Sequence, residues 1–237
     1  MKILIIAAPK SASTSLMRAL SNVTGLTAKQ EYFFSKGQKE KDFNFLARIF
    51  QKIFKSLHVV HVRHMESKKI RHIFPTHEFS LLSKFHSDIG DFNLNINLDD
   101  LLKHDIHKQH FPPTQNNLAI LKKTKKVILC RSSCQIVESY LREKPTEELL
   151  YLQEKIKNDS SFKESLTGEL DSWREKWTDA EKDNENSLII NYEELIQNPS
   201  VIINSILKFY EIDIKVHSNY NLPKERFSNK NEKTKAN

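Results

Sequence analysis

A short loop near the N-terminus groups several side chains that can bind an anion. The apolar run Ile3 to Ala8 leads into this loop, which consists of Pro9, Lys10, Ser11, Ala12, Ser13, Thr14 and Ser15. Apolar residues at helical spacing follow from Leu16, so the segment predicts a buried strand, a tight loop and a helix. A loop in this position gathers backbone N–H groups at the positive end of the helix dipole. Lys10 and the hydroxyls add donors, which favours a phosphate or sulfate ligand.

This loop differs from the Walker A phosphate loop. That motif requires two glycines and a lysine placed directly before the Ser or Thr that starts the helix. Here Lys10 opens the loop, and the loop contains no glycine. Taken alone, the segment is equally typical of an ordinary strand–helix turn with a serine cap.

A second predicted strand, residues 126–130, also ends in a basic residue, Arg131. A helix with apolar residues at helical spacing follows, and Ser139 lies on it. An arginine at the carboxyl end of a strand can form two hydrogen bonds to a phosphate, and a serine in the following helix can reach the same group. The alternative is a strand-end arginine paired with an acidic neighbour such as Glu138.

Together the two segments resemble the nucleotide-binding motifs of the sulfotransferase family. The order Pro-Lys-Ser-x-Ser-Thr is similar to that family's loop for the 5′-phosphosulfate. A strand-end Arg with a Ser eight residues later, just before a Tyr, is similar to its 3′-phosphate segment. Ala12 replaces the family's glycine, which costs stability if the loop requires a positive φ there. Ser15 replaces a tryptophan that packs on the adenine in some relatives.

The resemblance implies a donor and its contacts. The donor would be 3′-phosphoadenosine 5′-phosphosulfate (PAPS), with its 5′-phosphate on the loop and its 3′-phosphate on Arg131 and Ser139. Lys10 would contact the bridging oxygen of the leaving nucleotide. No metal is expected, because cationic and N–H groups neutralise the charge that Mg²⁺ handles in kinases.

Two residues are candidates for the general base. The run Lys108-Gln-His110-Phe-Pro is similar to Lys-Thr-His-Leu-Pro of the family's cytosolic branch, where the His is the base. His110 would then take the proton of the acceptor hydroxyl while Lys108 and Lys10 neutralise developing charge. Glu31 is the alternative, because glycan sulfotransferases use a Glu shortly before a Phe-Phe pair. An offset of one residue places Gln30 at that position instead.

Two further segments extend the resemblance. Tyr192 follows a third predicted strand, residues 187–191, where relatives carry a tyrosine that lies near the adenine. A capped strand–helix connection would explain it as well. The C-terminal residues are basic, and relatives close a basic loop over the nucleotide. The resemblance therefore implies that Arg226 or Lys230 contacts the 3′-phosphate. The alternative is that these residues belong to a solvated tail.

Strands that alternate with helices predict an α/β protein with a mainly parallel central sheet and helices on both faces. The resemblance specifies a P-loop-like sulfotransferase fold, with a domain over residues 1–213 and a polar, basic tail over residues 214–237. The remaining elements expected are a strand at 58–62, a helical turn at 98–102, and helices at 43–57, from Pro145, at 160–178 and at 199–210.

Composition narrows the class of protein. The chain has 237 residues, of which 38% are hydrophobic. Apolar runs recur throughout the chain and can offset the entropy of ordering, which argues against wholesale disorder. Two cysteines four residues apart form neither a disulfide scaffold nor a zinc site, so a reducing compartment is expected. The net charge of +7 suits anionic ligands of several classes. The first six apolar residues are too few for a signal peptide, and no run approaches the ~18–20 residues of a membrane span.

We therefore expect a cytoplasmic PAPS-dependent sulfotransferase without a transmembrane segment or a nucleic-acid partner. Its acceptor would be a hydroxyl or amine of a glycan or small molecule. Two alternatives stay open: a P-loop-type small-molecule kinase, and a non-catalytic module that binds a nucleotide or an anionic glycan on the same scaffold.

Overall fold

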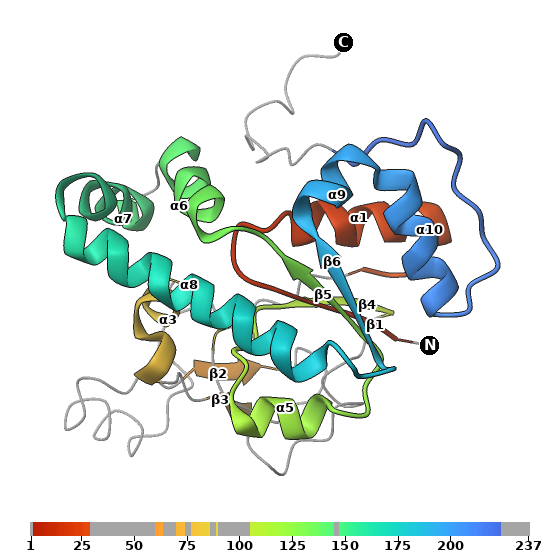
Figure 1. Ribbon diagram of the computed structural model, residues 1–237, viewed down its shortest axis with the longest axis horizontal. Coiled ribbons are helices and arrows are strands. Elements are labelled where there is room, and N and C mark those ends of the chain that lie inside the picture. The colour runs from red at the N-terminus through yellow and green to blue at the C-terminus, as the bar shows by residue number, and fades with distance from the viewer. Residues whose placement is uncertain are drawn as a thin grey trace.

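Four parallel strands form the central sheet of the protein, seen here in a computed structural model. Their order is β4 (Ile106–Gln109), β1 (Ile3–Ala7), β5 (Lys126–Cys130) and β6 (Ser187–Asn191). A separate antiparallel pair consists of β2 (Val60–Arg63) and β3 (Ile70–Ile73). The structure describes residues 2–28, 60–63, 70–73, 77–85, 89, 105–144 and 147–223 (Figure 1).

Helices cover both faces of the sheet. On one face Ile3 and Ile5 pack against α1 (Ser13–Thr24), α9 (Tyr192–Gln197) and α10 (Pro199–Phe209). Leu4 and Ile6 point to the other face. The elements there are η1 (His77–Phe79), α3 (Ser80–Phe85), α5 (Gln115–Leu121), α6 (Ser133–Arg142), α7 (Glu147–Asn158) and α8 (Ser160–Glu181).

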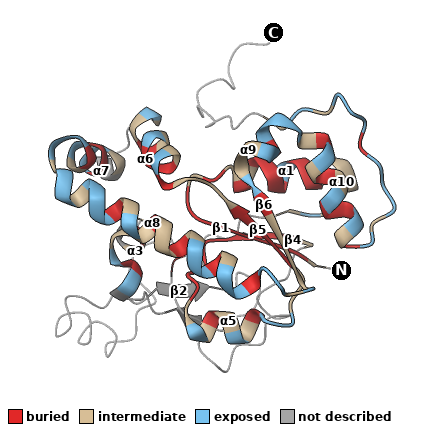
Figure 2. Ribbon diagram, viewed as in Figure 1, coloured by how far each residue is buried: buried red, intermediate tan, exposed pale blue. Residues whose placement is uncertain are grey.

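Burial on both faces explains the continuous apolar run of β1, all of whose residues are buried. Figure 2 shows the buried residues concentrated on the strands and on the inner sides of the helices. The predicted α/β fold with a mainly parallel sheet is therefore confirmed.

The predicted strands at 126–130 and 187–191 have the observed bounds, and the strand expected at 58–62 is β2. The helix expected at 160–178 continues to Glu181, and the one expected at 199–210 ends at Phe209. The sequence did not predict β3, η1, α3, β4, α5 or α9. The helix expected at 43–57 and the turn at 98–102 lie outside the described residues.

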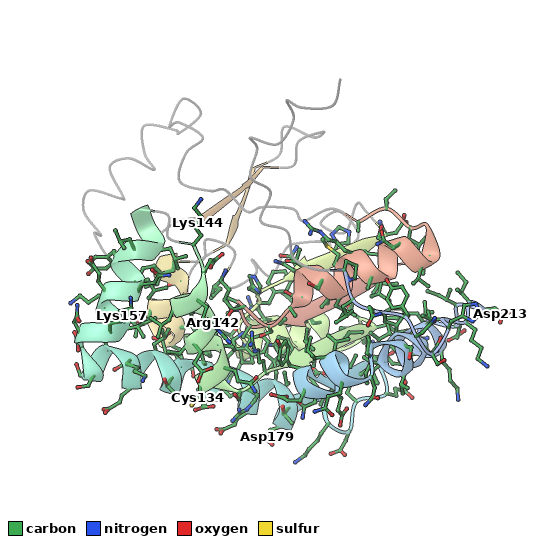
Figure 3. The ribbon with its side chains drawn as sticks, turned by 90° about the horizontal axis from the view of Figure 1, so that it is seen from above. Cys134, Arg142, Lys144, Lys157, Asp179 and Asp213 are labelled. Atoms are coloured by element: carbon green, nitrogen blue, oxygen red, sulfur yellow. The ribbon has the colours of Figure 1, made fainter. Side chains whose placement is uncertain are left out.

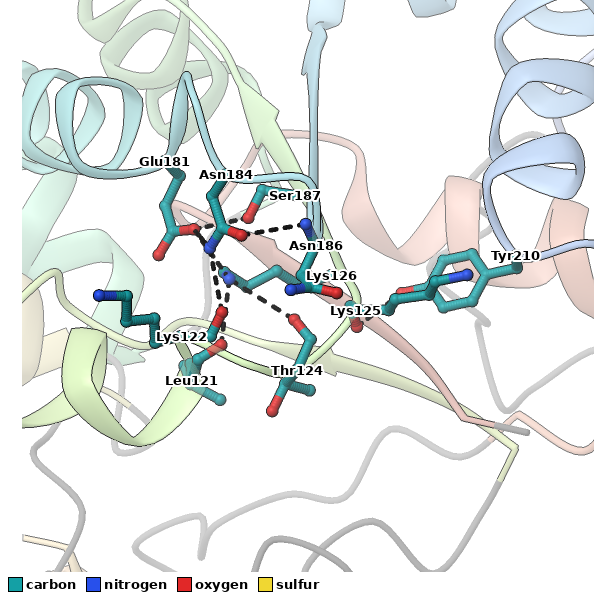
Figure 4. Close-up of polar contacts among 10 residues, drawn as sticks. All are labelled: Leu121, Lys122, Thr124, Lys125, Lys126, Glu181, Asn184, Asn186, Ser187 and Tyr210. Carbon is teal, nitrogen blue, oxygen red and sulfur yellow. Dashed lines mark hydrogen bonds and ion pairs between the residues drawn. The ribbon is translucent and has the colours of Figure 1, made fainter.

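A buried ion pair fastens the amino-terminal edge of the sheet (Figure 4). The Lys126 ammonium lies 2.9 Å from a carboxylate oxygen of Glu181, and their side chains are 0% and 3% exposed. Glu181 also accepts hydrogen bonds of 2.6 Å from Ser187 and from Asn184, and Lys126 donates to the Leu121 carbonyl at 3.1 Å. The network thus joins the end of α8 to the first residues of β5 and β6.

The described part of the predicted tail packs against helices. Val216 is buried beside α10, and its N–H and carbonyl are hydrogen-bonded by the Asn204 side chain at 2.8 and 3.1 Å. The Tyr220 ring also packs against the core on the side of the sheet that α1, α9 and α10 cover. The division into a domain of residues 1–213 and a tail of residues 214–237 stays a prediction. Within the described ranges, no helix is both long enough and apolar enough to span a bilayer.

Candidate functional site

The carboxyl ends of parallel strands lie at one edge of a sheet, and the predicted site residues follow those ends. The loop of Lys10 leaves β1, Arg131 leaves β5, His110 leaves β4 and Tyr192 follows β6. Both neighbours of β1 in the sheet, β4 and β5, come later in the chain. Ligands of open α/β sheets bind outside such a switch in strand order.

The loop after β1 has the backbone of an anion-binding turn. Lys10 and Ala12 adopt left-handed conformations, with φ of 63° and 58°, whereas Ser11 between them does not. Alternation of this kind turns successive N–H groups toward one side. Ala12 is the N-cap of α1 and offers no side-chain hydrogen bond to the first-turn N–H groups. The buried Ser11 hydroxyl has no hydrogen-bond partner among the described residues, so the loop suits a phosphate or sulfate group.

The Lys10 side chain forms an ion pair with Glu143, which follows α6. Its ammonium also lies 5.8 Å from the centre of the Tyr140 ring. The Lys10 carbonyl accepts a hydrogen bond from the Arg131 guanidinium. The two basic residues predicted at the site are therefore in direct contact.

Arg131 is supported by an aromatic ring and an amide. Its guanidinium carbon lies 4.0 Å from the centre of the Tyr192 ring, and its Nε donates to the Gln135 side chain at 3.3 Å. Glu138, the acidic partner considered for it, lies instead 3.8 Å from Arg142, with both side chains exposed. Ser139 is half-buried on α6.

His110 is buried and hydrogen-bonded through Nδ1 to the Ala7 carbonyl at 2.7 Å. Because a carbonyl can only accept, Nδ1 carries the proton and Nε2 carries the lone pair of the neutral ring. Burial, followed by the charges of Lys108 and Lys10, lowers the pKa of His110 to about 3. The imidazole is therefore neutral at physiological pH, the state that a general base requires.

Lys108 joins β4 to the loop, since its ammonium donates to the Thr14 hydroxyl at 3.2 Å. The register pairs Ile6 with Gln109, and so brings His110 level with Ala7. The position of His110 thus follows from the pairing of β4 with β1, which the sequence did not reveal.

Two tryptophans fix the residue after His110. The indole N–H groups of Trp173 and Trp177 both donate to the Phe111 carbonyl, at 3.1 and 2.9 Å. Asn117 donates to the next carbonyl, that of Pro112, at 2.9 Å. The sequence pattern predicts a helix at 160–178 but assigns no role to the two tryptophans on it. A buried indole N–H group needs a hydrogen-bond acceptor, and this requirement was the signal in the sequence that could have pointed to such contacts.

Some predicted residues lie outside the described part of the chain, namely Glu31, Arg226 and Lys230. Their roles stay predictions. Ser13 and Ser15 are buried in the first turn of α1, where Thr14 is half-buried. Among the described residues, no three His, Cys, Asp or Glu side chains are grouped so that they could hold a metal ion.

The parallel sheet, covered by helices on both faces, defines an α/β protein. Residues 1–237 match the model of the sulfotransferase domain. The chain belongs to the sulfotransferase family.

Solved structures of low sequence identity are also similar. A sulfotransferase from Alicyclobacillus acidocaldarius has 14% identity and a TM-score of 0.43, over 94% of this chain and 86% of that one. A mouse sulfotransferase complexed with PAP has 14% identity and a TM-score of 0.46, over 90% of this chain but 59% of that one. The sulfotransferase domain from the curacin biosynthetic pathway has 15% identity and a TM-score of 0.48, over 89% and 74%. No curated protein sequence gave a significant match.

Proposed function

We propose that the protein transfers the sulfuryl group of PAPS to a hydroxyl or amine of a glycan or small molecule. The observation that carries this proposal is the convergence of Lys10, Arg131 and His110 at one edge of the sheet, in a chain of the sulfotransferase family. The three residues follow three adjacent strands, and each has a chemistry that the transfer requires.

The donor would be held at both of its phosphates. The backbone N–H groups of the loop, with the hydroxyls of Ser11, Ser13 and Thr14, would bind the 5′-phosphate. Arg131 would bind the 3′-phosphate, together with Ser139. The stacking of Tyr192 on Arg131 supports a role for this tyrosine in holding the guanidinium. Lys10 would neutralise the charge that develops on the bridging oxygen.

His110 would act as the general base. Its Nε2 takes the proton of the acceptor hydroxyl, while the acceptor oxygen bonds to sulfur and the bond from sulfur to the nucleotide oxygen breaks. The products are a sulfate ester and 3′-phosphoadenosine 5′-phosphate (PAP). An anionic donor would offset the charges of Lys108 and Lys10 that lower the pKa of His110. Burial, the largest cause of the lowered pKa, would remain, so the donor would raise the pKa of His110 only in part.

Calorimetry with two nucleotides tests the donor assignment. We expect PAP to bind far more tightly than 5′-AMP, because only PAP carries a 3′-phosphate. Arg131→Ala should weaken PAP binding by about 1.5–3 kcal/mol, roughly 10- to 150-fold, and leave 5′-AMP binding little changed. Arg142→Ala is the control, since Arg142 is exposed at the end of α6. Equal affinities of the wild type for PAP and 5′-AMP would sink the assignment.

We also propose a cytoplasmic location. Cys130 and Cys134 are both free thiols, which supports a reducing compartment. Immunolocalisation of the expressed protein against a cytoplasmic marker tests this.

A further inference from the structure

We infer that Glu143 competes with the nucleotide for Lys10 and thereby limits how tightly the site retains the nucleotide product. The starting observation is the ion pair between the Lys10 ammonium and the Glu143 carboxylate. Both side chains are largely shielded from water, with 19% and 14% of their surfaces exposed. The identity of the nucleotide rests on the proposed function, whereas the ion pair does not.

Glu143 is held in place by its backbone. It is the C-cap of α6, and its carbonyl accepts a hydrogen bond of 2.8 Å from the Gln153 side chain. The same amide nitrogen donates to the Tyr140 carbonyl, also at 2.8 Å. Gln153 is buried on α7, so it fastens the chain between α6 and α7. The Glu143 carboxylate therefore has a defined position beside the loop after β1.

The neighbours of Glu143 behave differently. Arg142 and Lys144 are both exposed, and Figure 3 shows the Lys144 side chain extending away from the ribbon. Of these three consecutive charged residues, only Glu143 turns inward to a site residue. A carboxylate placed beside an anion-binding loop works against anion binding, because like charges repel strongly where water is scarce.

The consequence concerns both ends of the catalytic cycle. When the nucleotide binds, Lys10 must either leave Glu143 or bring a carboxylate close to the phosphates, and either event lowers the affinity. When PAP leaves, Glu143 is in position to pair with Lys10 again. Product release limits the turnover of many enzymes, so a lower affinity for PAP favours a faster cycle. Glu143 is a positioning residue in this scheme, since it acts through Lys10.

The test is the isosteric variant Glu143→Gln, with PAP binding measured by calorimetry and PAP dissociation by stopped flow. We expect PAP to bind about tenfold more tightly, mostly through slower dissociation. In steady state, kcat falls while kcat/KM does not. A purely structural role would instead weaken PAP binding. Glu138→Gln is the matched control, because Glu138 is exposed on the same helix. Glu143→Asp keeps the charge, so its PAP affinity should stay near that of the wild type.

A wild type that binds PAP, together with a Glu143→Gln variant that binds it no more tightly, overturns the inference and leaves the proposed function standing. A wild type that does not bind PAP overturns the proposed function. In that case the inference is tested separately by measuring the binding of inorganic pyrophosphate to both proteins. The inference fails if Glu143→Gln does not bind pyrophosphate more tightly than the wild type does. Acylation of Lys10, followed by peptide mass spectrometry, reports on the ion pair without any ligand and should become faster in Glu143→Gln.

Discussion

At the scale of single residues, His110 combines a fixed tautomer with a lowered pKa. We predict that His110→Ala binds PAP with the affinity of the wild type, because the proposed phosphate contacts come from other residues. Sulfuryl transfer should fall by ~10²–10⁴-fold, the usual contribution of a general base. Calorimetry and a transfer assay with labelled donor on an identified acceptor measure the two quantities separately.

Glu31→Gln and Lys10→Ala complete that experiment. Lys10→Ala should lose both transfer rate and PAP affinity, because Lys10 is one of the residues assigned to the charged donor. If Glu31→Gln is inactive while His110→Ala turns over normally, the base is Glu31. If both variants keep near-native rates, neither residue is the base.

Ala12 occupies a backbone conformation that favours glycine. The left-handed conformation costs an alanine ~1–2 kcal/mol. Glycine in turn lowers stability by ~0.4–1 kcal/mol, because it increases the conformational entropy of the unfolded chain. Ala12→Gly should therefore raise the free energy of unfolding by about 0.5–1 kcal/mol, measured by urea denaturation.

The control for Ala12→Gly is Ala19→Gly in the buried interior of α1, which should lower stability by about 1 kcal/mol. Equal losses of stability in the two variants would mean that the loop does not hold Ala12 in the left-handed region.

Two predicted site residues could be placed from the sequence pattern alone, because each follows the end of an apolar strand. They are Lys10 and Arg131, and the end of such a strand marks a position in the fold. Glu143 and Trp177 were missed. Glu143 reaches Lys10 through the turn between α6 and α7, and the acceptor of Trp177 is Phe111, which is distant in the sequence. Contacts of this kind follow from helix packing, which a local pattern does not encode.

At the scale of elements, the ion pair of Lys126 and Glu181 joins α8 to the sheet. Burial lowers the pKa of Lys126, and Glu181 opposes this shift. Glu181→Gln leaves a buried ammonium without its counter-charge, so it should lower the free energy of unfolding by roughly 3 kcal/mol. Thermal and urea unfolding measure this loss.

The adjacent lysine provides the matched control. Lys125 lies 2.6 Å from Glu211 in an exposed pair, so Glu211→Gln should change stability little. The double variant Lys126→Met with Glu181→Leu should recover most of the loss, because it removes both buried charges. A Glu181→Gln protein as stable as the wild type would show that the pair does not hold the sheet edge.

The sequence predicted β5 and β6 with their observed bounds, because both are apolar runs that pair with buried neighbours. It did not predict β4, whose residues Ile-His-Lys-Gln lack both an apolar run and alternation. β4 is a buried strand because β1 supplies its hydrogen bonds on one side and Ala28 forms a bridge on the other. Such pairing depends on residues far away in the chain.

At the scale of the whole molecule, four parallel strands bring the proposed donor contacts together, and these are cationic side chains, hydroxyls and backbone N–H groups. We predict that sulfuryl transfer proceeds at its full rate in excess EDTA, because these groups supply the positive charge needed by the leaving nucleotide. The measurement is transfer from labelled PAPS with and without the chelator. Loss of activity that Mg²⁺ restores would favour the kinase-like alternative.

β1 is an inner strand of the sheet, yet it comes first in the chain. Ile3 pairs with Ile106, and Leu4 pairs with Lys126, so both partner strands are translated much later. At ~5–20 residues per second, the ribosome needs roughly 6–24 s to reach the second of these partners. During that interval an apolar strand has two unpaired edges, a state prone to aggregation. The yield of folded protein should therefore depend on how well chaperones shield the nascent N-terminal segment.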